Sequence, residues 1–215
     1  MESFTIFADG SGDQTASVMQ EAMAFAKDQE LTKKEALRLR LLSEEMLGLL
    51  SGITNNNFDS MFWIEGEYPE CWLHLKARID MTADARSELL ASSTSGKNAA
   101  AVGLGGKIRD MITAGILELY DPTIVSDETS AFFFDAGTPD FESEDDSTTW
   151  NLSRYRETIS ELYDEGNGYA DGGSPDDDYE PMQELERSVI ANLADDVSVS
   201  IQNNNVEIVV YKVFG

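Results

Sequence analysis

The chain has 215 residues, with 41 acidic against 15 basic side chains, a formal net charge of -26, one Cys and one His. This length fits one large domain or one domain with a long insertion, and a 41% hydrophobic content is enough for a real core. The strong negative field argues against nucleic acid and membrane as partners, whereas basic ligands and proteins stay open.

Three further features predict a cytoplasmic protein. Cys71 has no second cysteine for an internal disulfide. No apolar run approaches the roughly 20 residues of a membrane span. The first residues, MESFTIFADG, lack the basic region and apolar stretch of a leader peptide.

The N-terminal part predicts one strand followed by two helices. FTIF has the pattern of a short strand. Thr32, with Glu35 three residues later, is a capping box that predicts the start of the second helix. The first helix has apolar residues at helical spacing, namely Val18, Met19, Ala22, Met23, Phe25 and Ala26. The apolar stripe of the second is Leu39, Leu42, Met46, Leu49, Leu50 and Ile53.

The next segments predict a hairpin and two more helices. MFWI, a polar turn EGEYPE and CWLHLKARID form the hairpin, with apolar residues alternating from Cys71 to Ile79. Thr82 is the expected cap of a short helix over ADARSELLAS. The amphipathic helix that follows a glycine cluster carries Ile108, Met111, Ile112, Gly115, Ile116 and Leu119.

The composition changes at about residues 121–180, which are rich in Asp, Glu, Gly and Ser and form an acidic insertion in a single domain of residues 1–215. Within it, only a helix behind Trp150 is expected to dock, through Leu152, Tyr155, Ile159 and Leu162. The last helix is expected to begin at Pro181 and to carry Met182, Leu185, Val189 and Leu193, before a closing hairpin of VSVSI and VEIVVYKV. The order predicts an α/β two-layer sandwich, with a mixed, mostly antiparallel sheet and helices on one face.

The glycine cluster in AAAVGLGGKIRDMI suits either a tight turn before a helix or the approach of backbone to a phosphate. The nearby stretch TSGKNAAA, with its Gly96-Lys97 pair, is no Walker loop, because Ala91 stands where the first glycine belongs and Asn98 where Ser or Thr belongs. The dinucleotide fingerprint also fails, because the cluster has no third glycine at the required spacing.

A second line on the second helix, away from its main apolar stripe, contains Leu37, Leu41, Glu44, Gly48 and Ser51, so the carboxylate of Glu44 continues a row that begins as apolar. One interpretation is a charged residue at the edge of a helix. The other is a base or hydrogen-bonding group at the mouth of a pocket.

Three motifs in order resemble one family. LRLLSEEMLGLLSG, KARIDMTAD and VGLGG are similar to the N, G1 and G2 boxes of the histidine-kinase-like ATPase (GHKL) family, whose Bergerat fold binds ATP in sensor kinases and gyrase. The nearest type is the anti-sigma-factor serine kinase. The resemblance covers about residues 1–120 and returns in the last helix and hairpin, and the acidic insertion has no counterpart.

The resemblance implies roles for individual residues. Glu44 takes the place of the family's catalytic Glu, and Asp80 that of the Asp that reads the adenine amino group. Gly48 replaces the family's magnesium-binding Asn, and Thr82 and Asp84 replace two glycines. ATP is therefore the implied cofactor, without its usual Mg²⁺ ligand.

The last box is the best preserved of the three. Gly103, Gly105 and a helix starting at Gly106 would turn backbone amides toward the phosphates. Lys97 or Lys107 would add positive charge.

Alternatives stay open for several of these residues. Asp80 also fits a surface carboxylate, because it falls on the polar alternation of its strand. His74 has no cluster of ligands around it in the sequence, and the acidic runs SEDD and SPDDDYE lack the EF-hand pattern, so no metal site is predicted. Two functions follow: a nucleotide-binding protein with weak or no catalysis, or a non-catalytic module that engages a regulatory protein partner through the insertion or an exposed helix.

Overall fold

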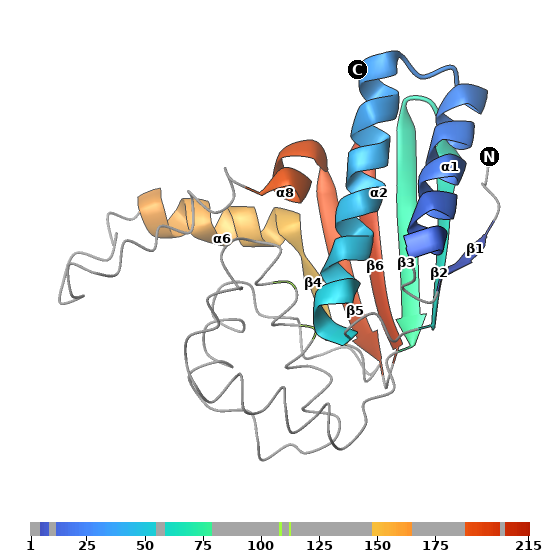
Figure 1. Ribbon diagram of the computed structural model, residues 1–215. Helices are drawn as coiled ribbons and strands as arrows, with labels where there is room; N and C mark the ends of the chain where they lie inside the picture. Colours follow the sequence, from blue (N-terminus) through green and yellow to red (C-terminus); the bar gives the residue numbers. More distant parts are fainter. Residues whose placement is uncertain are drawn as a thin grey trace, which may run out of the picture.

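The computed structural model describes residues 5–8, 12–54, 59–78, 108, 112, 148–164, 188–202 and 205–215. These residues form a six-stranded sheet with helices packed against it (Figure 1). The elements are β1 (Ile6–Ala8), α1 (Gly12–Asp28), α2 (Lys33–Thr54), β2 (Asp59–Glu67), β3 (Glu70–Arg78), β4 (Thr148–Asn151), α6 (Leu152–Asp164), α8 (Val189–Leu193), β5 (Asp196–Gln202) and β6 (Asn205–Val213).

The sheet has the strand order β1-β2-β3-β6-β5-β4. All five pairings between these described strands are antiparallel, so this part of the sheet contains no mixed pairing. The C-terminal hairpin inserts β6 beside β3, which places His74 of β3 between Trp63 of β2 and Val209 of β6. The expected α/β architecture with an antiparallel sheet and helices is thereby confirmed.

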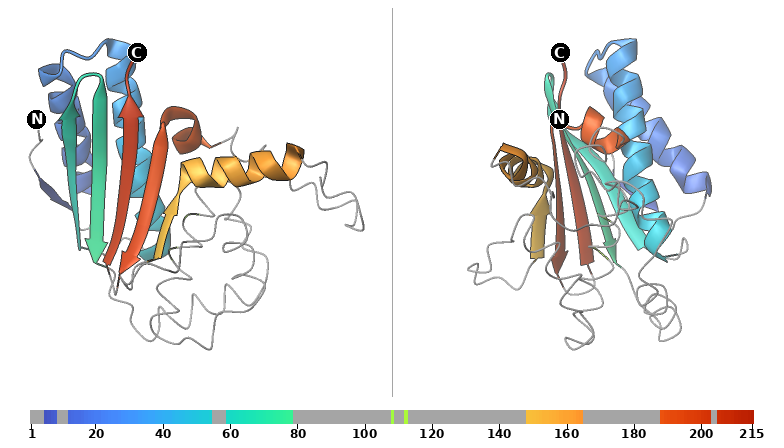
Figure 2. Two further views of the ribbon diagram at one scale, coloured as in Figure 1. Left: turned by 180° about the vertical axis from the view of Figure 1, so that it is seen from behind. Right: turned by 90° about the vertical axis from the view of Figure 1, so that its left-hand side faces the viewer.

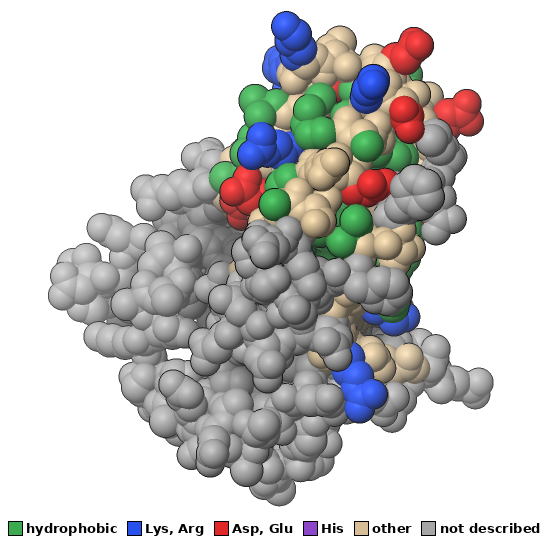
Figure 3. Space-filling model, turned by 45° about the vertical axis from the view of Figure 1, so that its right-hand side comes forward, with side chains coloured by type: hydrophobic (Ala, Val, Ile, Leu, Met, Phe, Trp, Pro, Cys, Tyr) green, Lys and Arg blue, Asp and Glu red, His purple; other side chains and the backbone are tan. Residues whose placement is uncertain are grey.

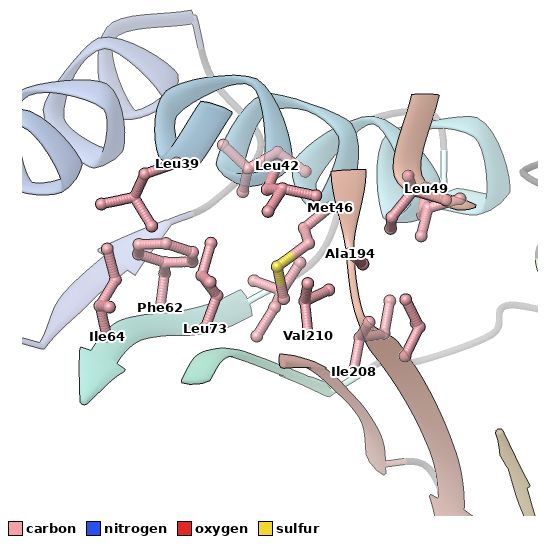
Figure 4. Packing of buried hydrophobic residues seen from close by; sticks show 14 of the residues in the cluster. Leu39, Leu42, Met46, Leu49, Phe62, Ile64, Leu73, Ala194, Ile208 and Val210 are labelled. Carbon is pink, nitrogen blue, oxygen red and sulfur yellow. The ribbon is translucent and has the colours of Figure 1, made fainter. Parts of the chain in front are cut away.

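Helices α1 and α2 cover one face of the sheet (Figures 1 and 2). Alternation on the strands supplies the apolar surface beneath them, as in β3, where Leu73 and Leu75 are fully buried. Figure 4 shows the side chains of α2 meeting those of the strands. The labelled members of this core are Leu39, Leu42, Met46, Leu49, Phe62, Ile64, Leu73, Ala194, Ile208 and Val210.

The predicted faces of α1 and α2 hold with one exception. Val18, Ala22 and Phe25 of α1 are buried, but Met23 is 43% exposed and lies outside the core, contrary to expectation. At about 100° per residue, Met23 falls outside the arc of α1 that meets the sheet. The prediction for α2 is confirmed where side chains are described, because Leu39, Leu42 and Met46 are fully buried.

The capping box at the start of α2 is confirmed. The Thr32 backbone N–H and hydroxyl donate to Glu35 Oε2, at 2.8 and 2.7 Å, and the Glu35 N–H donates back to Thr32 Oγ1 at 3.4 Å. These bonds satisfy donors that the first helical turn leaves without partners, and they hold the pKa of Glu35 below its ordinary value.

The β2–β3 hairpin is tighter than predicted. Both strands extend into the expected polar turn and leave only Tyr68 and Pro69, joined by a cis peptide bond, as the connection. Gly66 makes this possible, because its φ is +135° and a Cβ there would lie 2.8 Å from the Cα of Cys71. The prediction rested on the polar composition of EGEYPE alone and therefore placed the strand ends wrongly.

The acidic stretch contributes a strand that the sequence did not predict. β4 pairs with β5, and Trp150 lies opposite Val199. The expected helix behind it is confirmed as α6, with Leu152 and Tyr155 buried, and it projects from the edge of the sheet (Figure 1). Asn151 Oδ1 accepts from the backbone N–H of Arg154 and so caps this helix.

The last helix was predicted with the wrong start. Ser188 has an extended backbone, and its hydroxyl accepts from the backbone N–H of Ala191, so it is the N-cap of a short α8. A helix running from Pro181 through Leu193 is therefore wrong. Ile190 and Ala191 form the buried side of α8, whereas Val189, expected to be buried, is 41% exposed.

Among the described residues, no helix combines the length and apolar character needed to cross a membrane.

Candidate functional site

The residues of the predicted N box lie on α2. Their apolar side chains face the core, and the candidate residue Glu44 lies on the opposite, exposed side of the helix. Leu39, Leu42 and Met46 fix the helix against the sheet, because each is fully buried. Glu44 and Gly48 lie one turn apart on the exposed side of the same helix. The packing of α2 therefore leaves the carboxylate of Glu44 accessible to a ligand.

Gly48 has room for a larger side chain. Among the described residues, and apart from the flanking residues and the backbone of the helix itself, no heavy atom lies within 4 Å of the position that a Cβ would occupy. Its backbone is helical and its surface exposed, so neither a positive φ nor close packing requires glycine here. The side chain that would bind a metal in the resembled family is thus missing at a position that would accept it.

The adenine-reading candidate, Asp80, lies outside the described residues, two positions beyond the end of β3. The strand itself confirms the predicted alternation up to that end, because Ala77 is buried and Arg78 exposed.

The phosphate-binding candidates Lys97, Gly103, Gly105, Gly106 and Lys107 also lie outside the described residues. Ile108 and Ile112 follow them directly, and both are helical and buried in the core cluster. Their spacing agrees with the amphipathic helix predicted after the glycine cluster.

The described strands bring together a group that sequence reasoning did not connect. His74 Nε2 lies 3.2 Å from Glu65 Oε1, and the imidazole ring stacks on Trp63 with a centroid distance of 4.6 Å and an interplanar angle of 2°. His74 Nδ1 is enclosed without a hydrogen bond in the described part of the chain. Alternation placed His74 on the polar side of its strand, but only the register places it opposite Trp63.

A second polar group joins the C-terminal elements. Lys212 Nζ donates to Asp195 Oδ2 at 2.8 Å, and the backbone N–H of Val213 donates to the same oxygen at 2.7 Å. Partial burial acts to raise the pKa of Asp195, but the bonds from Lys212 and Val213 outweigh it and hold the pKa below its ordinary value. Arg156 of α6 donates to the carbonyl oxygens of Asp195 and Ala191.

Cys71 is a core thiol, as predicted. Its residue is 1% exposed, and burial raises the pKa of its thiol to about 12, so it remains protonated and unreactive at neutral pH.

Chemically, the described site offers the accessible carboxylate of Glu44 one turn from the exposed Gly48 on the same helix. No three His, Cys, Asp or Glu side chains in the described ranges gather where they could hold a metal ion.

The chain matches no family model, no curated protein and no solved structure in comparisons with known proteins.

Proposed function

We propose that this chain binds an adenine nucleotide and hydrolyses or transfers its phosphate weakly or not at all. The observation that carries the proposal is the exposure of Glu44 and Gly48 on one side of α2, while the opposite side of the helix is buried in the core. A carboxylate held on a rigid helix suits a group that orients water or a hydroxyl beside a bound phosphate.

The order of the described elements supports the same proposal. Two helices precede the β2–β3 hairpin, and a short helix precedes the β5–β6 hairpin, in the order that the resemblance to the histidine-kinase-like ATPases predicts. The sequence that leads to Asp80 continues directly from β3, which is seen between α1 and α2 in Figure 1.

Weak turnover follows from position 48. Phosphoryl transfer relies on Mg²⁺ to bridge the phosphates and to neutralise the charge that develops on them. Glycine supplies no side-chain oxygen for the metal. A protein that binds ATP here would therefore lack an electrostatic contribution on which the chemical step depends.

The test is the variant Gly48→Asn, which restores a metal ligand where the structure has space for it. We expect it to increase magnesium-dependent ATP binding or hydrolysis, and Glu44→Ala in that background to remove the increase. Gly48→Ala is the matched control: it should stabilise the exposed helix by about 0.5 to 1 kcal/mol without adding any response to Mg²⁺. Strong magnesium-dependent hydrolysis by the wild type, abolished by Glu44→Ala, would contradict the proposed weak turnover.

One observation favours a second function, that of a non-catalytic module for a protein partner. Leu37 and Leu41 lie one turn apart on α2 and are 54% and 36% exposed, beside the basic residues Lys33, Lys34 and Arg40. On the described part of the face in Figure 3, hydrophobic and basic side chains lie interspersed with acidic ones. Such a surface fits an acidic partner with apolar side chains. An interaction module without a ligand would show no change in melting temperature with ATP or ADP.

A further inference from the structure

We propose that two copies of this chain pair through the exposed side of α2, with the two helices antiparallel and a two-fold axis at the level of Leu39. The proposal rests on the second function above, that of a module for a protein partner, and it names the partner. The paired surface, called the α2 face, consists of the exposed residues Lys33, Lys34, Leu37, Leu41, Glu44 and Glu45. In Figure 1, α2 is seen unobscured with the sheet behind it.

The α2 face carries opposite charges at positions equally far from Leu39. Four residues lie on one side of this centre as they do on the other, with Lys at one end, Glu at the other end and Leu beside the centre. The mirrored pairs are Lys33 and Glu45, Lys34 and Glu44, and Leu37 and Leu41. Both members of every pair are exposed. A two-fold axis at Leu39 therefore lays basic side chains on acidic ones and apolar side chains on apolar ones.

Helix geometry also keeps the matching charges on the same flank. At about 100° per residue, the two leucines lie on either side of the line that faces the second copy. Lys34 and Glu45 lie on one flank of that line, and Lys33 and Glu44 lie on the other. A two-fold axis perpendicular to the helices keeps each flank on its own side and reverses its direction. Lys34 then meets Glu45 of the second copy. Lys33 meets Glu44 of the second copy, and each contact occurs twice.

These charges are available for pairing. Among the described residues, none of the four charged side chains of the α2 face forms a hydrogen bond or an ion pair. Glu35, the acidic residue next to Lys34, is buried and bonded to Thr32. Residues 27–34 carry three basic and two acidic side chains, so the first end keeps a positive charge. Residues 43–54 contain Glu44 and Glu45 and no basic residue, so the other end is negative.

The presence of both signs favours a second copy over another acidic protein. A uniformly acidic partner that met Lys33 and Lys34 would also meet the acidic end of the same helix, whereas a second copy complements both ends. Arg40 separates the two occupants further. It lies one position from Leu39, so the axis brings it near Arg40 of the second copy, at the rim of the contact. An acidic partner would gain from Arg40, but the second copy binds better without it.

The size of the contact predicts a weak, reversible dimer. The α2 face is roughly 20 Å long, and with α1 alongside it the layer is roughly 20 Å wide, so the contact covers on the order of 400 Å² from each copy. This is below the usual size of specific interfaces, which predicts a Kd of about 10 to 100 μM. The net charge of -26 opposes association at long range. At about 0.15 M salt, most of that repulsion is screened, whereas pairs in contact persist.

The first test is sedimentation equilibrium of the full chain without nucleotide, at up to about ten times that Kd. Leu37 is 54% exposed, so Leu37→Lys should keep the far-UV circular dichroism of the wild type and weaken the dimer at least about tenfold. The added Lys lowers the net negative charge, so long-range repulsion cannot cause this loss. Val209→Lys, on the opposite face of the sheet, is the matched control and should change affinity less than about twofold.

Two results of this first test would overturn the pairing. One is a wild type that stays monomeric throughout the range, and the other is a dimer that survives Leu37→Lys. A dimer that is lost in Val209→Lys, with the circular dichroism unchanged, would also overturn it, because the contact would then use the sheet.

The second test reverses charges across the axis. Lys34→Glu and Glu45→Lys should each weaken the dimer at least about fivefold, because each change creates two like-charge contacts. The two residues lie three turns apart within one helix, so recovery of affinity in the double variant would come from contact between copies. Arg40→Gln should strengthen the dimer about twofold or more. Additive losses in the double variant, or a dimer weakened by Arg40→Gln, would overturn the antiparallel arrangement.

Failure of the pairing can be told apart from failure of the proposed functions. A nucleotide held beside Glu44 would compete with the second copy, which is why the sedimentation is run without nucleotide. A monomeric wild type overturns the second copy as the partner. The melting temperature with ATP or ADP, measured on the same protein, decides separately whether the chain binds nucleotide or is a module without a ligand.

Discussion

Lys212 and Asp195 form an ion pair in which one partner is nearly enclosed and the other is half in solvent. Nζ and Oδ2 are 2.8 Å apart, with the Lys212 side chain 11% and the Asp195 side chain 42% exposed. Lys212 points from β6 toward the helix side of the sheet, opposite Cys71 in the register of β3. The pair thus links the end of β6 to the segment between α8 and β5.

The unequal burial of this pair predicts unequal effects of mutation. Asp195→Ala leaves an enclosed ammonium without its partner and should lower the free energy of unfolding by about 2 kcal/mol. Lys212→Met leaves a carboxylate that water can reach, and should cost about 1 kcal/mol. Urea unfolding measures both, with Lys76→Met, which removes an exposed pair, as the control costing under about 1 kcal/mol. Equal losses for Asp195→Ala and Lys212→Met would show that burial does not decide the effect.

The same carboxylate predicts a pH dependence. Because the folded pKa of Asp195 lies below its ordinary value of 3.8, its contribution to stability is present above that value and is lost as pH falls through the folded pKa. Wild type and Asp195→Asn should therefore differ by a constant amount from about pH 7 to about pH 5 and converge below about pH 4. Solvent screening keeps the effect modest, since the Asp195 side chain is 42% exposed. A difference that grows with acidification would contradict the assignment.

The cap of α2 can be tested by removing a single hydroxyl. Thr32→Ala loses the oxygen that accepts from the Glu35 N–H and the hydroxyl that donates to its carboxylate. We expect a loss of about 1 kcal/mol in the free energy of unfolding. Thr32→Ser keeps the hydroxyl and should stay close to the wild type in the same urea titration. A Ser variant as unstable as the Ala variant would mean that the methyl group, rather than the cap, is responsible.

Arg156 predicts how firmly α6 is attached to the rest of the fold. Its guanidinium donates through two nitrogens to the carbonyl oxygens of Ala191 and Asp195, a fork that the single ammonium of Lys does not reproduce. Arg156→Lys should speed amide exchange in α6 by about 2- to 10-fold, the equivalent of one hydrogen bond. Arg154→Lys, on an exposed position of the same helix, should change exchange little. If α6 amides exchanged at equal rates in Arg156→Lys and Arg154→Lys, Arg156 would not be what attaches α6 to the rest of the fold.

Short sequence patterns correctly predicted the elements that are determined by residues close together in the chain. The capping box fixed the start of α2, and the 3.6-residue period of Leu39, Leu42 and Met46 identified its buried side. Alternation in β3 identified the face that carries Leu73 and Leu75. In each of these cases the residues that determine the structure lie within a few positions of each other.

The errors arose where distant residues decide the structure. β4 is short and partly polar, and it is a strand because β5 offers it hydrogen-bond partners, with Trp150 opposite Val199. The helix predicted from Pro181 is interrupted at Ser188, whose extended backbone caps α8. Sequence placed Glu44 on a helix, but whether it lies near Asp80 depends on a segment outside the described residues, and no local pattern contains that distance.

The most direct test of the proposed function is a thermal shift with ATP and with ADP, each with and without Mg²⁺. A ligand that binds only the folded state must stabilise it, by about 2.7 kcal/mol at a hundred times its Kd. We predict that both nucleotides raise the melting temperature, that Mg²⁺ adds little to the shift, and that Asp80→Ala remains folded but loses it. A melting temperature that neither nucleotide changes, at concentrations up to the millimolar range, would contradict nucleotide binding by this chain.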